Sequence, residues 1–114
     1  MIYEMKLKEL YYSKIQSGEK IYEIRLNDEK RQVLSVGDVI VFRKEPELLE
    51  TVQTEILDLI HFKSFEELVN SLALNDIGFD GYDKDNVIDV YHSIYSAEQE
   101  NKYGVLAIKL KVID

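Results

Sequence analysis

The sequence predicts an α+β domain in which a small mixed β-barrel carries short helices on its flanks. Most of the chain divides into segments that alternate apolar and polar residues, as half-buried strands do, and segments with helical spacing. The predicted order, β-α-β-β-β-α-α-β, gathers the strands together, which argues against a doubly wound parallel sheet. The 114 residues, 46% of them hydrophobic, suffice for one compact core and are too few for two, so we expect a single domain over residues 1–114.

Strands are expected where apolar positions alternate or where β-branched and aromatic residues run together. Five segments have these properties: residues 2–7, 20–26, 39–42, 51–62 and 103–112. Closing these strands into a barrel would remove the exposed edges of the sheet.

Helices are expected in three places. The first covers residues 8–17, with Leu10, Tyr11 and Ile15 on its apolar stripe and Gly18 as its C-terminal cap. The second begins at a Ser-x-x-Glu capping box, Ser64 to Glu67, and runs to about Leu72. The third covers 86–95, with Val87, Val90, Tyr91 and Ile94 on its inner face, and the polar segments 75–86 and 96–100 are expected to be loops.

The charge is divided unevenly along the chain. The net charge is −8, but residues 1–45 carry nine Lys and Arg against eight Asp and Glu, whereas residues 46–114 carry five against fourteen. Any anion-binding surface should therefore use the first forty-five residues. A protein that wraps a long duplex is not expected, because such binding needs many phosphate contacts. The charge distribution still allows a compact site that binds a short strand or a nucleoside.

Composition excludes several other classes of site. The chain has no Cys, which rules out disulfides and thiolate metal sites and fits a reducing compartment. No apolar run approaches the roughly 20 residues of a membrane helix, and the N-terminus lacks a secretory apolar region. His61 and His92 are isolated in the sequence. We therefore expect a cytoplasmic protein with no metal and no cofactor.

The octet Gly18 to Arg25, Gly-Glu-Lys-Ile-Tyr-Glu-Ile-Arg, resembles the Gly-x-Lys-x-x-Glu-x-Arg motif of the ASCH superfamily. Residues 36–42, 62–68 and 103–108 are also similar to the family, at similar spacing. The resemblance, to small bacterial ASCH proteins in particular, implies a PUA-like β-barrel with a cleft beside the motif, a role in binding RNA and a cytoplasmic setting.

Some bacterial members that this sequence resembles are hydrolases, either of acetylcytidine or of RNA. In the amidohydrolase pattern a Thr stands at the position of Glu23 and works with the preceding lysine, which is Lys20 here. This chain has the lysine without the hydroxyl, and a carboxylate does not simply replace a hydroxyl in that role. The resemblance therefore favours a binding function, with a hydrolase as the alternative.

The three motif residues define the expected site. Glu23 and Arg25 lie two apart on one strand and so share a face, while Lys20 is expected at the mouth of the strand. Arg25 offers a planar fork for a phosphate or a base edge, and Lys20 offers a point charge. Glu23 could orient Arg25, accept a hydrogen bond from an amine, or act with Lys20 as the catalytic pair of a hydrolase. The alternative is an ion pair on a solvated strand face.

Other residues could extend this site. Asn27, Lys30 and Arg31 follow the motif strand and could contact a ligand or phosphate, as an alternative to an exposed loop. Tyr12 and Tyr103 are the expected stacking platforms for a base. Further candidates carry less weight: Lys6 and Lys8 beside the cleft, Tyr91 and Tyr95 as stacking residues, and Glu98 and Glu100 as a second carboxylate.

Three functions follow from these patterns. The first is a module that binds single-stranded RNA or a nucleotide or nucleoside. The second is a hydrolase of RNA or of a modified nucleoside. The third is an acidic domain that binds a basic protein through residues 46–114.

Overall fold

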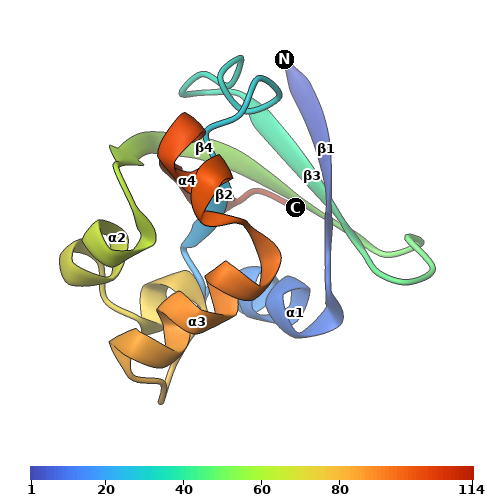
Figure 1. Cartoon of the computed structure of the whole chain (residues 1–114). Helices are drawn as coiled ribbons and strands as arrows, with labels where there is room; N and C mark the ends of the chain where they lie inside the picture. Colours follow the sequence, from blue (N-terminus) through green and yellow to red (C-terminus); the bar gives the residue numbers. More distant parts are fainter.

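The computed structural model describes residues 1–114 and contains one five-stranded sheet, curled into half a barrel, with four α-helices around it (Figure 1). The strands are β1 (Ile2–Leu7), β2 (Tyr22–Leu26), β3 (Val39–Lys44), β4 (Thr51–Phe62) and β5 (Val105–Val112). The helices are α1 (Glu9–Ser17), α2 (Phe65–Ser71), α3 (Lys84–Ile94) and α4 (Ala97–Tyr103), and η1 is a 3-10 turn at Asn75–Ile77. The α+β class and the mixed, barrel-like sheet are confirmed.

The strand order across the sheet is β1-β3-β4-β5-β2. β1 pairs with β3 in parallel, and every other neighbouring pair is antiparallel. A register shift between Ile56 and Asp58 interrupts the long pairing of β4 with β5, and such irregularities bend a strand and increase its twist. The barrel remains open between its two edge strands, β1 and β2, and this opening is where the motif lies.

Both faces of the sheet are buried. On one face, α1 covers a core that includes Phe42, Ile56 and Ile108. On the other face, α2, η1 and α3 cover a second core that includes Phe65 and Val105. Figure 1 shows α2, α3 and α4 gathered on one side of the sheet. Because β5 has a core on each side, its sequence is a nearly continuous apolar run, as expected for a strand buried on both faces.

Helix α1 turns a different side to the core from the one that the sequence predicts. Tyr12 and Ile15 are buried, at 2% and 1% exposed, whereas Leu10 is 56% exposed. Tyr11 is only partly buried. Tyr12 is three residues before Ile15 and Tyr11 is four, and both spacings place side chains on one helical face, so the apolar pattern alone did not distinguish the two adjacent tyrosines.

Helix α4 occupies a segment for which the sequence predicts an acidic loop. Ser96 caps it with a complete capping box, because the Ser96 side chain accepts from the backbone N–H of Gln99 and the Gln99 side chain accepts from that of Ser96. The final strand accordingly begins at Val105, and Tyr103 lies in the last turn of α4. The loop prediction is wrong because a seven-residue polar helix has almost no apolar periodicity to detect.

The α4 helix places a buried carboxylate between two other helices. Glu100 is 7% exposed; its Oε2 accepts the backbone N–H of Phe65 at 2.7 Å, and its Oε1 lies 2.9 Å from Nε2 of His92. These contacts join α4 to the start of α2 and to α3. Glu100 is therefore a structural residue of the helical layer and not a carboxylate of the cleft.

None of the helices is both long and apolar enough to span a membrane.

We predict that Glu100→Ala lowers the free energy of unfolding by about 1–3 kcal/mol, because it leaves the Phe65 N–H buried without an acceptor. Urea denaturation followed by circular dichroism measures the change. Glu98→Ala is the matched control, since Glu98 is exposed on the same helix, and it should shift stability by less than about 0.5 kcal/mol. Equal effects in the two variants would contradict the structural role of Glu100.

Candidate ligand-binding site

The first residue of the motif ends a helix. Gly18 has φ of 85°, and its N–H donates to the carbonyl of Ile15. A left-handed residue at this position suits glycine because it has no Cβ. The chain then reverses, and the backbone N–H of Lys20 donates to the carbonyl of Lys14. This reversal brings Lys20 into the interior immediately before β2 begins.

Lys20 is buried, at 4% exposed, and does not lie at the rim where the sequence analysis placed it. Its Nζ donates to the carbonyls of Tyr22 at 2.6 Å and Ile77 at 3.0 Å, and it lies 3.3 Å from Oε1 of Glu23. Gly78 makes room for the side chain, because a Cβ at that position would lie 2.9 Å from Cδ of Lys20. Lys20 therefore anchors the floor of the site to η1.

Glu23 and Arg25 project from the same face of β2, as predicted. The Nε of Arg25 donates to Oε2 of Glu23 at 2.6 Å. The Nη2 of Arg25 donates to the carbonyl of Lys6 at 3.0 Å. Lys6 belongs to β1, so this guanidinium bridges the two edge strands across the opening of the barrel. The alternative of an ion pair on a solvated strand face is wrong, since Glu23 is only 5% exposed.

The three charges shift one another's ionisation. Burial lowers the pKa of Lys20 even though the nearby Glu23 carboxylate opposes that change. Burial alone would raise the pKa of Glu23, but the charges of Arg25 and Lys20 and their hydrogen bonds hold it below the ordinary value. Burial likewise disfavours the Arg25 cation, and the Glu23 charge outweighs this and raises the pKa of Arg25. The cluster therefore holds two cations around one carboxylate.

Two cavities meet at the bridge between Arg25 and Lys6, and both residues line both cavities. The first, which we call the aromatic pocket, has a volume of about 350 Å³ and lies between β2, α1 and α3. Lys20 and Glu23 form part of its wall. Its aromatic lining consists of Tyr11, Phe79, Tyr91 and Tyr95.

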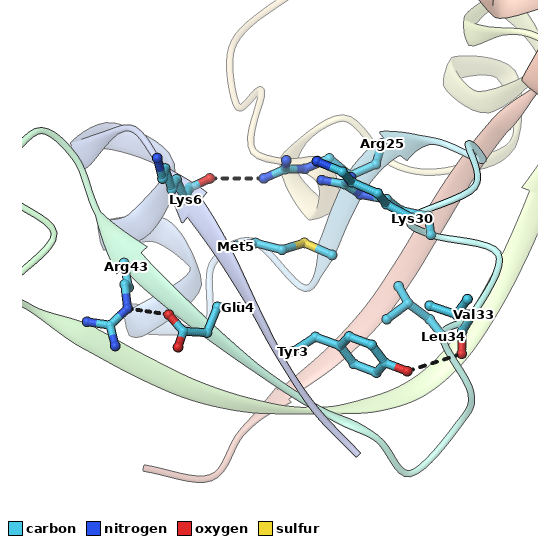
Figure 2. A pocket seen from close by; sticks show the side chains of 10 residues that line it. Tyr3, Glu4, Met5, Lys6, Arg25, Lys30, Val33, Leu34 and Arg43 are labelled. Carbon is cyan, nitrogen blue, oxygen red and sulfur yellow. Dashed lines mark hydrogen bonds and ion pairs between the residues drawn. The ribbon is translucent and has the colours of Figure 1, made fainter.

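The second cavity, which we call the basic pocket, has a volume of about 590 Å³. Its cationic lining residues are Lys6, Arg25, Lys30, Arg31 and Arg43, and its single carboxylate is Glu4. Figure 2 shows the basic pocket, with Lys6, Arg25 and Lys30 along one side and Glu4 paired with Arg43 on another. The site thus combines an aromatic chamber with a cationic one, joined through a shared arginine.

The family model for the ASCH domain matches residues 5–114. The chain belongs to the ASCH domain family.

Two solved structures are similar to this ASCH domain over its whole length. The hypothetical protein PH0355 is 32% identical with a TM-score of 0.88, over 99% of this chain and 100% of its own. Protein PF0455 from Pyrococcus furiosus is 32% identical with a TM-score of 0.82, over 100% of this chain and 99% of its own. A comparison with curated proteins gives no match.

The structure of the ASCH domain brings together some of the predicted site residues. Lys20, Glu23 and Arg25 are adjacent, and Lys30 and Arg31 line the basic pocket beside Arg25. Their part in ligand binding stays a prediction.

Three other predicted residues lie elsewhere in the ASCH domain. Asn27 lines neither pocket; its backbone N–H donates to the carbonyl of Gly104, and its carbonyl accepts from Gln32. The hydroxyl of Tyr103 hydrogen-bonds to Glu29 outside both pockets. The choice of Tyr12 as a stacking residue is wrong, because its ring lies in the core and has no face open to a ligand.

Several residues of the ASCH site received little weight from the sequence. Tyr11, Tyr91 and Tyr95 line the aromatic pocket, and so does Ile94, which is 60% exposed in spite of its apolar helical position. The sequence predicted Tyr11 in the core and Tyr12 at the site, and the structure has these two positions reversed. The sequence carries no signal for the exposure of Ile94, because Ile94 stands at an apolar helical position like the buried Val87 and Tyr91.

The basic pocket also contains residues that sequence reasoning underrated. Lys6 was a minor candidate and Arg43 was not singled out. Both lie on the parallel pair β1 and β3, where Lys6 is directly opposite Arg43 in the register. The pairing of strands far apart in sequence creates this juxtaposition, and no local pattern predicts it.

We predict that Glu23→Gln destabilises the domain by about 3–5 kcal/mol near neutral pH, because it leaves a buried ammonium without its counter-ion. The folded pKa of Glu23 lies below its ordinary value of 4.5, so its stabilising contribution is present above that pH. The contribution is lost as the pH falls through the folded pKa.

The stability difference between wild type and Glu23→Gln should therefore shrink on acidification. Urea denaturation at several pH values between about 7 and 3 measures it. Glu98→Gln, an exposed carboxylate, is the control. A difference that stays constant over this range would show that Glu23 carries no stabilising charge.

Proposed function

We propose that this ASCH domain binds single-stranded RNA or a nucleotide, with a base in the aromatic pocket and its phosphate at Arg25. The observation that supports the proposal is the position of Arg25, whose guanidinium forms a wall common to the aromatic pocket and the basic pocket. Its Nε and Nη2 are held by Glu23 and by the Lys6 carbonyl, which leaves Nη1 for a ligand. A guanidinium fixed in this way is preorganised to donate to a phosphate oxygen.

The aromatic pocket has the features of a base-binding chamber. Proteins bind splayed bases by stacking them on aromatic rings and by a few polar groups at the base edge. Tyr91 and Tyr95 are both stacked on Phe65, with ring centroids 4.5 and 5.8 Å away, but Tyr91 is buried, whereas Tyr95 and Tyr11 are only partly buried and line the pocket. The partly buried rings are the ones available to a base, and Tyr91 stabilises the wall behind them.

The charge distribution favours a short or single-stranded ligand. The molecule carries a net charge of −8, and five of its fourteen Lys and Arg residues line the basic pocket beside the motif. A long duplex would meet acidic surface beyond this site. A strand that places one or two phosphates at the site avoids that repulsion.

The geometry supports binding over hydrolysis. Both oxygens of Glu23 are engaged by cations, which lowers its pKa and makes it a weak base. Lys20 directs its nitrogen at three acceptors, two carbonyls and Glu23, as an ammonium with three protons does. An ammonium has no lone pair. A general base needs an accessible lone pair near a reacting proton. An acidic protein-binding surface on residues 46–114 stays a separate prediction.

We predict that Tyr95→Ala weakens binding of a short single-stranded RNA by about 5- to 100-fold, the range expected for loss of one stacked base. Tyr95→Phe keeps the ring and should bind within about twofold of wild type. Fluorescence anisotropy with a labelled ten-nucleotide RNA of mixed sequence measures both, after circular dichroism confirms the fold. Equal affinities for the two variants would remove Tyr95 from the site.

We also predict that Arg25→Gln weakens the same RNA at least about tenfold, because a charge-assisted contact to phosphate is lost. Lys63→Gln removes an exposed positive charge that lines neither pocket and serves as the control. If Arg25→Gln folds normally and binds RNA as tightly as Lys63→Gln does, the proposed function is wrong.

A further inference from the structure

We propose that the basic pocket is a phosphate subsite for the stretch of strand next to the bound base. This inference rests on the proposed function and adds to it the class of ligand and the path of the ligand's backbone from one pocket to the other. The ligand would be an oligonucleotide with at least one phosphodiester beyond the one at Arg25. Its backbone would leave the aromatic pocket past the bridge between Arg25 and Lys6 and enter the basic pocket.

The cations of this pocket come from distant parts of the chain. Lys6 lies on β1, Arg25 on β2 and Arg43 on β3, and Lys30 and Arg31 lie in the connection between β2 and β3. Five cationic residues and one carboxylate line this pocket, in a molecule whose net charge is −8. Such a concentration of one sign attracts anions and raises their local concentration.

Two of the five cations are not paired with a carboxylate, whereas Arg25, Arg31 and Arg43 are. Lys6 and Lys30 have no carboxylate partner. Arg31 is held only by a long contact of 3.7 Å between its Nη1 and Asp28, and its Nε is buried without any hydrogen-bond partner. Arg43 donates its Nε to Glu4 and its Nη1 to the carbonyl of Leu48. Donors therefore remain free on several cations around one cavity.

The rest of the lining suits a backbone better than a base. The uncharged residues are Tyr3, Met5, Val33 and Leu34, and the hydroxyl of Tyr3 contacts the Val33 carbonyl at 3.4 Å (Figure 2). One tyrosine among five cations contrasts with the four aromatic rings of the aromatic pocket. Apolar walls also lower the local dielectric and strengthen the attraction between cation and phosphate. The two pockets thus divide base recognition from phosphate recognition.

The double variant Lys30→Gln with Arg43→Gln tests the subsite without touching the Lys20–Glu23–Arg25 cluster. Neither side chain is buried, so the fold should persist. Affinity for the ten-nucleotide RNA should fall about tenfold at low salt. The slope of log K against log salt should become shallower by about 1.4, which is two lost contacts to a single strand. Binding of uncharged ribonucleosides should not change.

The matched control is Lys63→Gln with Lys84→Gln, which removes the same charge from exposed positions outside both pockets. If RNA binds but both double variants have the same affinity and salt slope, the subsite is wrong while the proposed function stands.

Inorganic tripolyphosphate, titrated into wild type and both double variants, separates the remaining outcomes. If neither RNA nor nucleosides bind the wild type, the proposed function fails. Tripolyphosphate binding that depends on Lys30 and Arg43 would then identify the basic pocket as a site for free polyphosphate. If tripolyphosphate does not bind either, the subsite fails as well.

Discussion

The site depends on one buried carboxylate. Glu23 lies between the ammonium of Lys20 and the guanidinium of Arg25, and each cation is also tied to backbone carbonyls of other elements. Through Lys20 the cluster reaches η1, and through Arg25 it reaches the opposite sheet edge. Because an unpaired charge in this environment would be costly, all three residues must be present together. The same ion cluster therefore ties the edge strand β2 to its surroundings and positions the guanidinium of Arg25 between the two pockets.

Local backbone geometry brings these charges together. Gly18 ends α1 in a left-handed conformation, and Gly78, with φ of 95°, lets the aliphatic stem of Lys20 pass beside it. A Cβ at Gly78 would press on Lys20, so the buried lysine and this glycine depend on each other. The family motif contains the first of these glycines and the three charged residues. The second glycine lies sixty residues after the first, in a different element, and is outside the motif.

The two cavities show how a protein with a negative net charge can contain a cationic site. Residues 46–114 carry fourteen Asp and Glu against five Lys and Arg, and this excess of negative charge disfavours polyanions. Positive charge is concentrated at one opening, beside aromatic side chains. Such an arrangement favours ligands that place a base and a small number of phosphates together. The two pockets differ in lining, aromatic on one side of Arg25 and cationic on the other, and this difference is the basis of the proposed orientation of the ligand.

The sequence alone was sufficient for the fold class, for the strands with clear alternation, for the helix starting at Ser64 and for grouping Lys20, Glu23 and Arg25, although it placed Lys20 at the rim. These features are encoded in short stretches, where periodicity, capping residues and a family motif are all local signals. Only the tertiary structure decided which of Tyr11 and Tyr12 lines the aromatic pocket, that Glu100 is a buried structural acid, and that Lys6, Arg25 and Arg43 line one pocket. Each of these depends on the packing of elements far apart in the chain. The rotation of a helix about its axis, or the pairing of two strands, determines whether a side chain is buried or faces a cavity. No local sequence pattern carries that information.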